Sequence, residues 1–218
     1  MKDFVPVADG TKKLITLVGI FAAASILANV VATKIADLGL AFATVAILFY
    51  PITFIIDNTI SEVWGKHIAR RVVWTGLIAN ILMTLVFFIS IRVPAAPFYD
   101  QQQAFETILG SVPRIALASI VAYSISQHLD IFLFLGIRKK TQGKHLWLRN
   151  NVSTWISQLI DTVIFTFIAF FGTIPLEEIW GIITTEYTLK IIIAVVSTPI
   201  VYLMVNWARK ADTVSQAA

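Results

Sequence analysis

The sequence predicts an all-α membrane protein with six transmembrane helices. Its 218 residues are 57% hydrophobic and only 14% charged, which is far from the balance of a soluble domain. It also contains six apolar runs of about 17 to 25 residues, the length that a helix needs to cross about 30 Å of hydrocarbon. These runs cover residues 14–33, 40–56, 72–93, 112–135, 152–172 and 187–207.

The six runs predict one transmembrane domain over residues 14–207, with cytoplasmic tails at 1–13 and 208–218. The first run follows two lysines, so a cleaved signal peptide is an alternative reading of it. Its length and the polar Asn29 within it favour a retained helix. The chain contains no cysteine, which excludes a disulfide framework.

The membrane topology explains the net charge of +4, because most basic residues fall in segments on one side of the predicted membrane. With the N-terminus inside, the outside loops carry mainly acidic residues, and the positive-inside rule then places both termini in the cytoplasm. No nucleic-acid partner is needed to explain the charge. The inside segments hold Lys2, Lys12, Lys13, Lys66, Arg70, Arg71, Arg138, Lys139, Lys140, Lys144, Arg149, Arg209 and Lys210.

Polar side chains interrupt the fifth and fourth runs at helical spacing. In "STWISQLIDTVIFTF", Thr154, Gln158 and Asp161 lie on one helix face, with Asp161 near the predicted middle of the membrane. A carboxylate at that depth costs about 2.5 to 3.5 kcal/mol, so it should face protein or water. The fourth run repeats the arrangement with Ser119, Tyr123, Gln127 and Asp130.

Further amides lie in the first and third runs, at Asn29 and Asn80. Taken alone, each amide is explained by a hydrogen bond between helices, which contributes about 0.6 to 2 kcal/mol. Taken together, the acids, amides and tyrosine predict a polar cavity between the helices.

The second run predicts a kink and a charged helix end. Pro51 lacks a backbone N–H and crowds the preceding turn, so it is expected to bend this helix. Asp57 and Glu62 then meet the cytoplasmic interface, with Lys66, Arg70 and Arg71 following. This segment is either a gate or coupling site at the mouth of the cavity or a helix end with neutralising ion pairs.

Six spans also divide into two halves of three, which would be inverted relative to each other, as in many transporters. The sequence has no phosphate-binding glycine loop, zinc motif, nucleophile elbow or cysteine nucleophile. These absences argue against an enzyme and against a bound metal or cofactor.

The chain resembles the vitamin uptake transporter family, which includes bacterial queuosine precursor transporters. The resemblance rests on "FYPITFIIDNTISEVWGKHIARRVVW", "RIALASIVAYSISQHLDIFLF" and "NNVSTWISQLIDTVIFTFIAFFG". It implies a six-helix protein of the bacterial inner membrane that imports a 7-deazaguanine such as preQ0 or preQ1 without an obligatory ATPase. The family positions present are Asn29, Pro51, Asp57, Gly65, Arg70, Arg71, Arg114, Tyr123, Gln127, Asp130 and Asp161. Gln158 stands where an Asn is expected in relatives.

This resemblance suggests how a 7-deazaguanine would be bound. A carboxylate can accept the paired N–H donors of the base, an amide can donate to its O6 atom, and an aromatic ring can stack on its flat face. The expected substrate-binding residues are Asn29, Tyr123, Gln127, Asp130, Trp155, Gln158 and Asp161. The expected gate or coupling residues are Pro51, Asp57, Glu62, Arg70 and Arg71.

Several alternatives stay open at this point. Proton coupling through Asp57, Asp130 or Asp161 and simple facilitation are both compatible with the sequence. The chain could instead be the substrate-binding subunit of an energy-coupling-factor type vitamin importer. An intramembrane enzyme that acts on lipid with a metal held by its carboxylates is the alternative from another class. A homo-oligomer is also compatible with the sequence.

Overall fold

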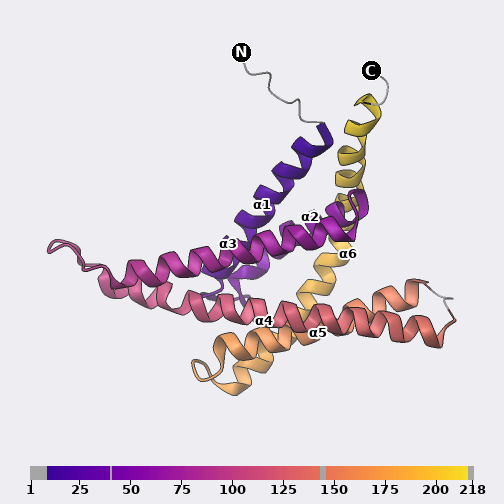
Figure 1. Cartoon of the computed structure of the whole chain (residues 1–218). Coiled ribbons are helices and arrows are strands. Elements are labelled where there is room, and N and C mark those ends of the chain that lie inside the picture. The colour runs from indigo at the N-terminus through magenta and orange to yellow at the C-terminus, as the bar shows by residue number, and fades with distance from the viewer. Residues whose placement is uncertain (1–8, 40, 143–145, 216–218) are drawn as a thin grey trace, which may run out of the picture. The chain divides into compact units, whose positions relative to one another are not determined.

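The computed structural model describes residues 9–39, 41–142 and 146–215, and it is built almost entirely of helices (Figure 1). This confirms the predicted all-α class. The predicted tails lie partly outside the described residues, as do Lys2 and Lys144. The elements are α1 (Asp9–Val31), β1 (Ile35–Asp37), β2 (Phe42–Thr44), the 3₁₀ helix η1 (Val45–Leu48), α2 (Tyr50–Val63), α3 (Lys66–Arg92), α4 (Gln102–Lys140), α5 (Leu146–Phe170) and α6 (Leu176–Ser215).

Within the described residues, five of the helices are long and apolar enough to cross a membrane. They make the chain a multi-pass membrane protein. The membrane-crossing stretches are Asp9–Val31, Lys66–Arg92, Gln102–Ile137, Val152–Phe170 and Leu176–Lys210.

The predicted boundaries of the second span, 40–56, are wrong. The described part of this segment contains β2, which pairs antiparallel with β1 so that Ile35 lies opposite Thr44, then η1 and the start of α2. The 14 residues of α2 extend only about 21 Å, which is less than the hydrocarbon thickness. An apolar run of sufficient length is therefore not one continuous helix here.

The kink predicted at Pro51 is wrong for a related reason. Pro51 lies in the first turn of α2, where its backbone N–H would have no partner within the helix in any case. The proline therefore starts the helix and does not bend it.

The described residues form two compact units, which are described separately. Unit 1 contains those of Met1–Val30, Ala46–Met83 and Lys190–Ala218, and unit 2 contains those of Val31–Val45 and Thr84–Leu189. Helices α3 and α6 each contribute to both units, so the units do not coincide with the first three and last three helices. The inverted three-helix halves stay a prediction.

The core of unit 1 is apolar and lies where α1, α2 and the first half of α3 meet. Leu17, Ile56, Ile60, Ala69 and Val72 are buried there. Burial of a leucine, isoleucine or valine side chain typically stabilises by about 1.5 to 3 kcal/mol.

The turn between α2 and α3 depends on Gly65. Its φ of +88° lies in the left-handed region that residues with a Cβ rarely adopt. This turn allows α3 to begin at Lys66, directly after α2 ends.

Unit 2 is dominated by α4 and α5, which pack against each other along their lengths (Figure 1). Arg114 of α4 reaches the end of α5, where its Nε atom donates to the Ile168 carbonyl at 2.6 Å and its Nη2 atom donates to the Phe171 carbonyl. A cation at a helix C-terminus satisfies the last carbonyls and complements the helix dipole. This contact gives Arg114 a structural role.

Candidate functional site

The polar faces of α4 and α5 carry the same short motif. Residues 126–130 read SQHLD on α4, and residues 157–161 read SQLID on α5, so both follow the pattern Ser-Gln-x-x-Asp. In each motif the serine lies four residues before the aspartate, which places both side chains on one helix face. The two helices therefore present matching polar groups.

The two motifs contact each other reciprocally. Ser126 Oγ of α4 donates to Asp161 Oδ1 of α5 at 3.3 Å. Ser157 Oγ of α5 donates to Asp130 Oδ1 of α4 at 3.4 Å. Because the helices run antiparallel and the spacing is four in each motif, the serine of one motif meets the aspartate of the other.

Both serines also have a backbone acceptor on their own helix. Ser126 Oγ lies 3.1 Å from the Tyr123 carbonyl oxygen, and Ser157 Oγ lies 3.0 Å from that of Thr154. The serines are buried, at 6% and 5% exposed, whereas both aspartates are only partly buried. Each aspartate is therefore reached by a buried hydroxyl and is itself partly exposed.

The serines were missed by sequence reasoning because their partners depend on the pairing of α4 with α5. The repeated Ser-Gln-x-x-Asp pattern was the signal that could have indicated them, since it marks equivalent positions in two polar helices. Polar residues inside apolar helices often mark a functional site. Two copies of one polar motif indicate such a site more strongly than a single aspartate does.

Six of the seven residues expected to bind substrate lie on α4 and α5 in unit 2. Gln127 is exposed, Tyr123 and Gln158 are half-buried, and Trp155 is 46% exposed. Asp130 and Asp161 themselves accept the reciprocal serine contacts. Their role in binding stays a prediction.

Asn29, the seventh, belongs to unit 1 and contacts α3. Its Nδ2 atom donates to Asn80 Oδ1 at 2.6 Å, and Asn80 in turn donates to Ser25 Oγ at 2.8 Å. Both asparagines are buried. This ladder is the hydrogen bonding between helices that was the simpler explanation for each amide.

Of the residues predicted to act as a gate or coupling site, Glu62 has a partner that the sequence did not indicate, and the role of the set stays a prediction. Glu62 Oε1 accepts a hydrogen bond from Arg209 Nη2 of α6 at 2.8 Å, and both side chains are more than half exposed. The expected neighbours Arg70 and Arg71 are exposed and make no ion pair with the described residues. Glu62 is thus held by a cation far away in the sequence.

Asp57 lies in α2, outside the five long apolar helices, and is half-buried. Its role as a coupling residue stays a prediction.

A buried carboxylate on α6 is a further residue that the sequence did not indicate. Glu186 directly precedes the predicted span 187–207, but it is only 3% exposed. Its Oε1 atom accepts from the Thr44 backbone N–H at 2.9 Å and from the Thr44 hydroxyl. It thereby fixes the β1–β2 hairpin to α6.

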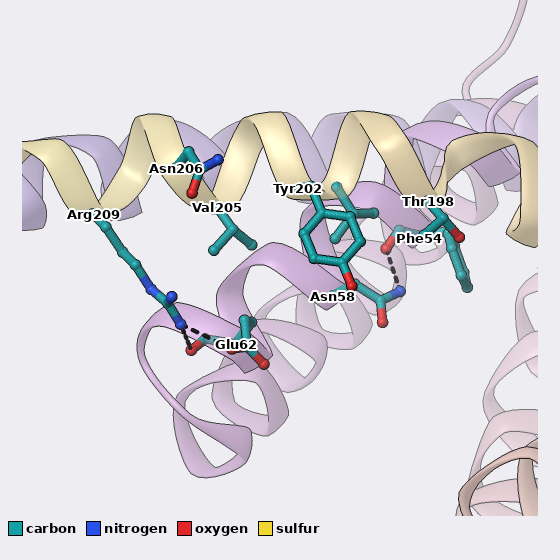
Figure 2. A pocket seen from close by; sticks show the side chains of 9 residues that line it. Phe54, Asn58, Glu62, Thr198, Tyr202, Val205, Asn206 and Arg209 are labelled. Carbon is teal, nitrogen blue, oxygen red and sulfur yellow. Dashed lines mark hydrogen bonds and ion pairs between the residues drawn. The ribbon is translucent and has the colours of Figure 1, made fainter. Parts of the chain in front are cut away.

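Unit 1 also contains a cavity of about 510 Å³ between α2 and the C-terminal half of α6 (Figure 2). It is lined by Phe54, Asn58, Glu62, Thr198, Val201, Tyr202, Val205, Asn206 and Arg209. We call it the α2–α6 groove. Of the residues singled out from the sequence for binding or gating, it includes Glu62.

A metal centre has no evident ligands in the part of the chain that the structure describes. There, no three His, Cys, Asp or Glu side chains gather closely enough to hold an ion. The functional groups of both units are hydroxyls, carboxamides, carboxylates and aromatic rings, which suit recognition by hydrogen bonding.

Comparison with known proteins gives the family. The family described as "Putative vitamin uptake transporter" matches residues 44–204. A Bacillus subtilis (strain 168) protein named "Probable queuosine precursor transporter" is 34% identical over 180 residues, which are 82% of this chain and 79% of that protein. No solved structure matches this chain.

Two further relatives are more distant. The "Queuosine precursor transporter" of Escherichia coli (strain K12) is 29% identical over 67% of this chain and 65% of its own length. A Haemophilus influenzae protein named "Probable queuosine precursor transporter" is 26% identical over 68% of this chain and 62% of its own. All three relatives are named as transporters and none as an enzyme. With the family match covering most of its length and both Ser-Gln-x-x-Asp motifs, this chain belongs to the vitamin uptake transporter family.

Proposed function

We propose that this chain imports a queuosine precursor, a 7-deazaguanine of the preQ0 or preQ1 type, across the bacterial cytoplasmic membrane. Its relatives in three bacteria carry the name of queuosine precursor transporters, and its long apolar helices suit a multi-pass transporter. The observation that carries the proposal is the reciprocal pairing of two Ser-Gln-x-x-Asp motifs on α4 and α5.

The chemistry of the two motifs matches the edge of a 7-deazaguanine. Asp161 is the group proposed to accept the ring N–H and the exocyclic amine together, because a carboxylate has two acceptor oxygens. Gln158 or Gln127 donates to the O6 atom, and Tyr123 or Trp155 stacks on the ring. Asp161 has this role because it lies at the middle of the apolar stretch Val152–Phe170.

The serines allow the carboxylates to be satisfied with and without substrate. A serine hydroxyl has one hydrogen, and Ser126 can give it to Asp161 or to the Tyr123 carbonyl. When the base takes the Asp161 carboxylate, Ser126 keeps its backbone acceptor. At 3.3 Å the serine–aspartate bond is longer than the usual O–H···O distance, so replacing it is inexpensive.

Transport is proposed to occur by alternating exposure of this site to the two sides of the membrane. Asp130 and Asp161 are the candidates for proton coupling at the site itself, and Asp57 is the candidate in unit 1. Simple facilitation remains the alternative to coupling, and a pH gradient across proteoliposomes distinguishes the two.

Substitution of Asp161 tests the proposal directly. Asp161→Asn keeps the size of the side chain but replaces one acceptor oxygen by a donor, so uptake of preQ1 should fall by about tenfold or more, the cost of one mispaired charged hydrogen bond. Uptake is measured in cells that lack their own transporter, with the membrane level of the protein determined in parallel. Unchanged uptake at equal protein level would remove Asp161 from the site.

The same assay with purified protein separates two kinds of importer. Uptake by the protein alone in liposomes supports a self-sufficient transporter. Uptake that requires an added membrane subunit and ATPases would identify the chain as a substrate-binding subunit of an energy-coupling-factor importer.

A further inference from the structure

The α2–α6 groove contains hydrogen-bonding groups that the fold itself does not use. The Asn58 Nδ2 atom donates to the Phe54 carbonyl at 2.8 Å, and its Oδ1 atom has no partner among the described residues (Figure 2). The Tyr202 hydroxyl and the Asn206 carboxamide have no hydrogen-bond partner among the described residues. One amide oxygen, one hydroxyl and one carboxamide that line the cavity therefore have no hydrogen-bond partner among the described residues.

Such groups are unfavourable against lipid. An unpaired amide or hydroxyl in an apolar surrounding costs about 2 to 7 kcal/mol, depending on the reference state, whereas the same group in water or against a ligand costs little. Tyr202 and Asn206 lie on α6 within the apolar stretch Leu176–Lys210. Polar residues in such a stretch are expected to face water or a ligand.

The charges of the groove cancel. Glu62 and Arg209, the two charged lining residues, form an ion pair with 2.8 Å between Oε1 and Nη2 at one end of the groove (Figure 2). A charged ligand would therefore find no unpaired counter-charge there. The lining favours a neutral ligand with both donors and acceptors.

The remaining lining residues favour a flat ligand. Phe54 and Tyr202 supply aromatic rings, and Val201 and Val205 supply an apolar wall. Flat rings stack on aromatic side chains, and a volume of about 510 Å³ lies in the range of small-molecule sites.

We infer that the α2–α6 groove is a second binding site, which takes a neutral, planar heterocycle that hydrogen-bonds at its edge, with the Glu62–Arg209 ion pair closing one end. This goes beyond the proposed function, because it concerns α2 and α6 in unit 1 and not the paired motifs of α4 and α5. It assigns ligand contacts to Asn58, Tyr202 and Asn206.

Single cysteines test this inference cleanly, because the natural chain contains none. Val201→Cys and Thr198→Cys place a thiol in the groove one turn apart on α6. Val196→Cys is the matched control, since Val196 lies on the same helix and is 66% exposed but does not line the groove. The full-length variants are placed in membrane vesicles of both orientations and treated with a charged, membrane-impermeant maleimide.

Labelling depends on water, because the thiolate is the reactive form. The groove cysteines should react about tenfold faster than Val196→Cys, since lipid suppresses ionisation of the control thiol. Guanine or 7-deazaguanine should slow labelling of the groove cysteines in proportion to occupancy. Tyr202→Phe together with Asn206→Leu, in the Val201→Cys background, should abolish that slowing while leaving the labelling rate high.

Equal labelling of groove and control cysteines would overturn the inference, because the groove would then be no more hydrated than the exposed surface of α6 at Val196. If the groove cysteines react fast and neither heterocycle slows the reaction, the groove does not bind a neutral, planar heterocycle. Uptake of preQ1 by the same variants reports separately on the proposed function. Slowed labelling without uptake would contradict the proposed function alone, and uptake without slowing would contradict this inference alone.

Discussion

At the scale of single residues, the paired motifs depend on two serines as much as on two aspartates. Each serine hydroxyl has one hydrogen and two acceptors within reach, a facing carboxylate and a backbone carbonyl. The serines therefore orient Asp130 and Asp161 without holding them permanently.

Removal of either serine hydroxyl should weaken transport to a similar extent. Ser126→Ala and Ser157→Ala each delete one long bond to a carboxylate, which corresponds to about 0.5 to 1 kcal/mol and hence about two- to fivefold in uptake of preQ1. The measurement is the initial uptake rate at equal protein level. Ser124→Ala is the control, because Ser124 is exposed and donates only to the Ile120 carbonyl of its own helix. A large effect of one serine and none of the other would contradict the reciprocal arrangement.

Spacing in the sequence predicted one polar face on each of α4 and α5, because residues three and four apart share a helix face. Asp130 and Asp161 of those faces do contact the facing helix, whereas Gln127 is exposed. It did not indicate which groups across the interface would pair. The contact of Ser126 with Asp161 depends on the antiparallel pairing of two helices. The sequence of one helix alone does not indicate that pairing. The partner of Glu62 was missed for the same reason, since Arg209 lies at the far end of the chain.

At the scale of elements, the segment before α2 shows where hydropathy misleads. An apolar run of spanning length predicted one helix over 40–56. The Thr44 backbone N–H instead donates to Glu186, and residues 42–44 form the second strand of the β1–β2 hairpin. Pro51 then sits where a helix can begin without loss of a hydrogen bond. Hydropathy alone predicts neither a tertiary contact such as Thr44–Glu186 nor the residue at which a helix begins.

The Thr44–Glu186 contact should determine the stability of this segment. Glu186→Leu leaves the Thr44 N–H and hydroxyl without an acceptor, at about 1 to 3 kcal/mol for each buried group, and should lower the thermal unfolding temperature measurably. Glu186→Gln retains an acceptor oxygen and should lower it less. Glu177→Leu is the control, because Glu177 is exposed in the first turn of α6. Equal unfolding temperatures for Glu186→Leu and Glu177→Leu would show that the contact does not hold the hairpin.

At the scale of the whole molecule, the family match and the five long apolar helices agree on a multi-pass transporter. The number of crossings is less simple. Five crossings would place the termini on opposite sides, whereas the distribution of lysines and arginines places both termini in the cytoplasm. The segment from β2 through α2 would have to supply the sixth crossing.

Reporter fusions decide the number of crossings. A fluorescent protein that folds only in the cytoplasm should be bright at both the N-terminus and the C-terminus, because basic residues flank the first and last long helices on the same predicted side. Alkaline phosphatase fused after residue 100, in the predicted outside loop, should be active. A dark C-terminal fusion together with a bright N-terminal one would mean that the β2–α2 segment does not cross.

The bond between Thr44 and Glu186 joins residues 142 positions apart, and this has a consequence for biosynthesis. A ribosome adds about 5 to 20 residues per second, so the early hairpin must wait roughly ten seconds or more for its acceptor to be made. During that interval its donor groups have only water, lipid headgroups or the insertion machinery as partners. Nascent chains that stall before the last helix should therefore be more easily cleaved by protease around Thr44 than finished ones.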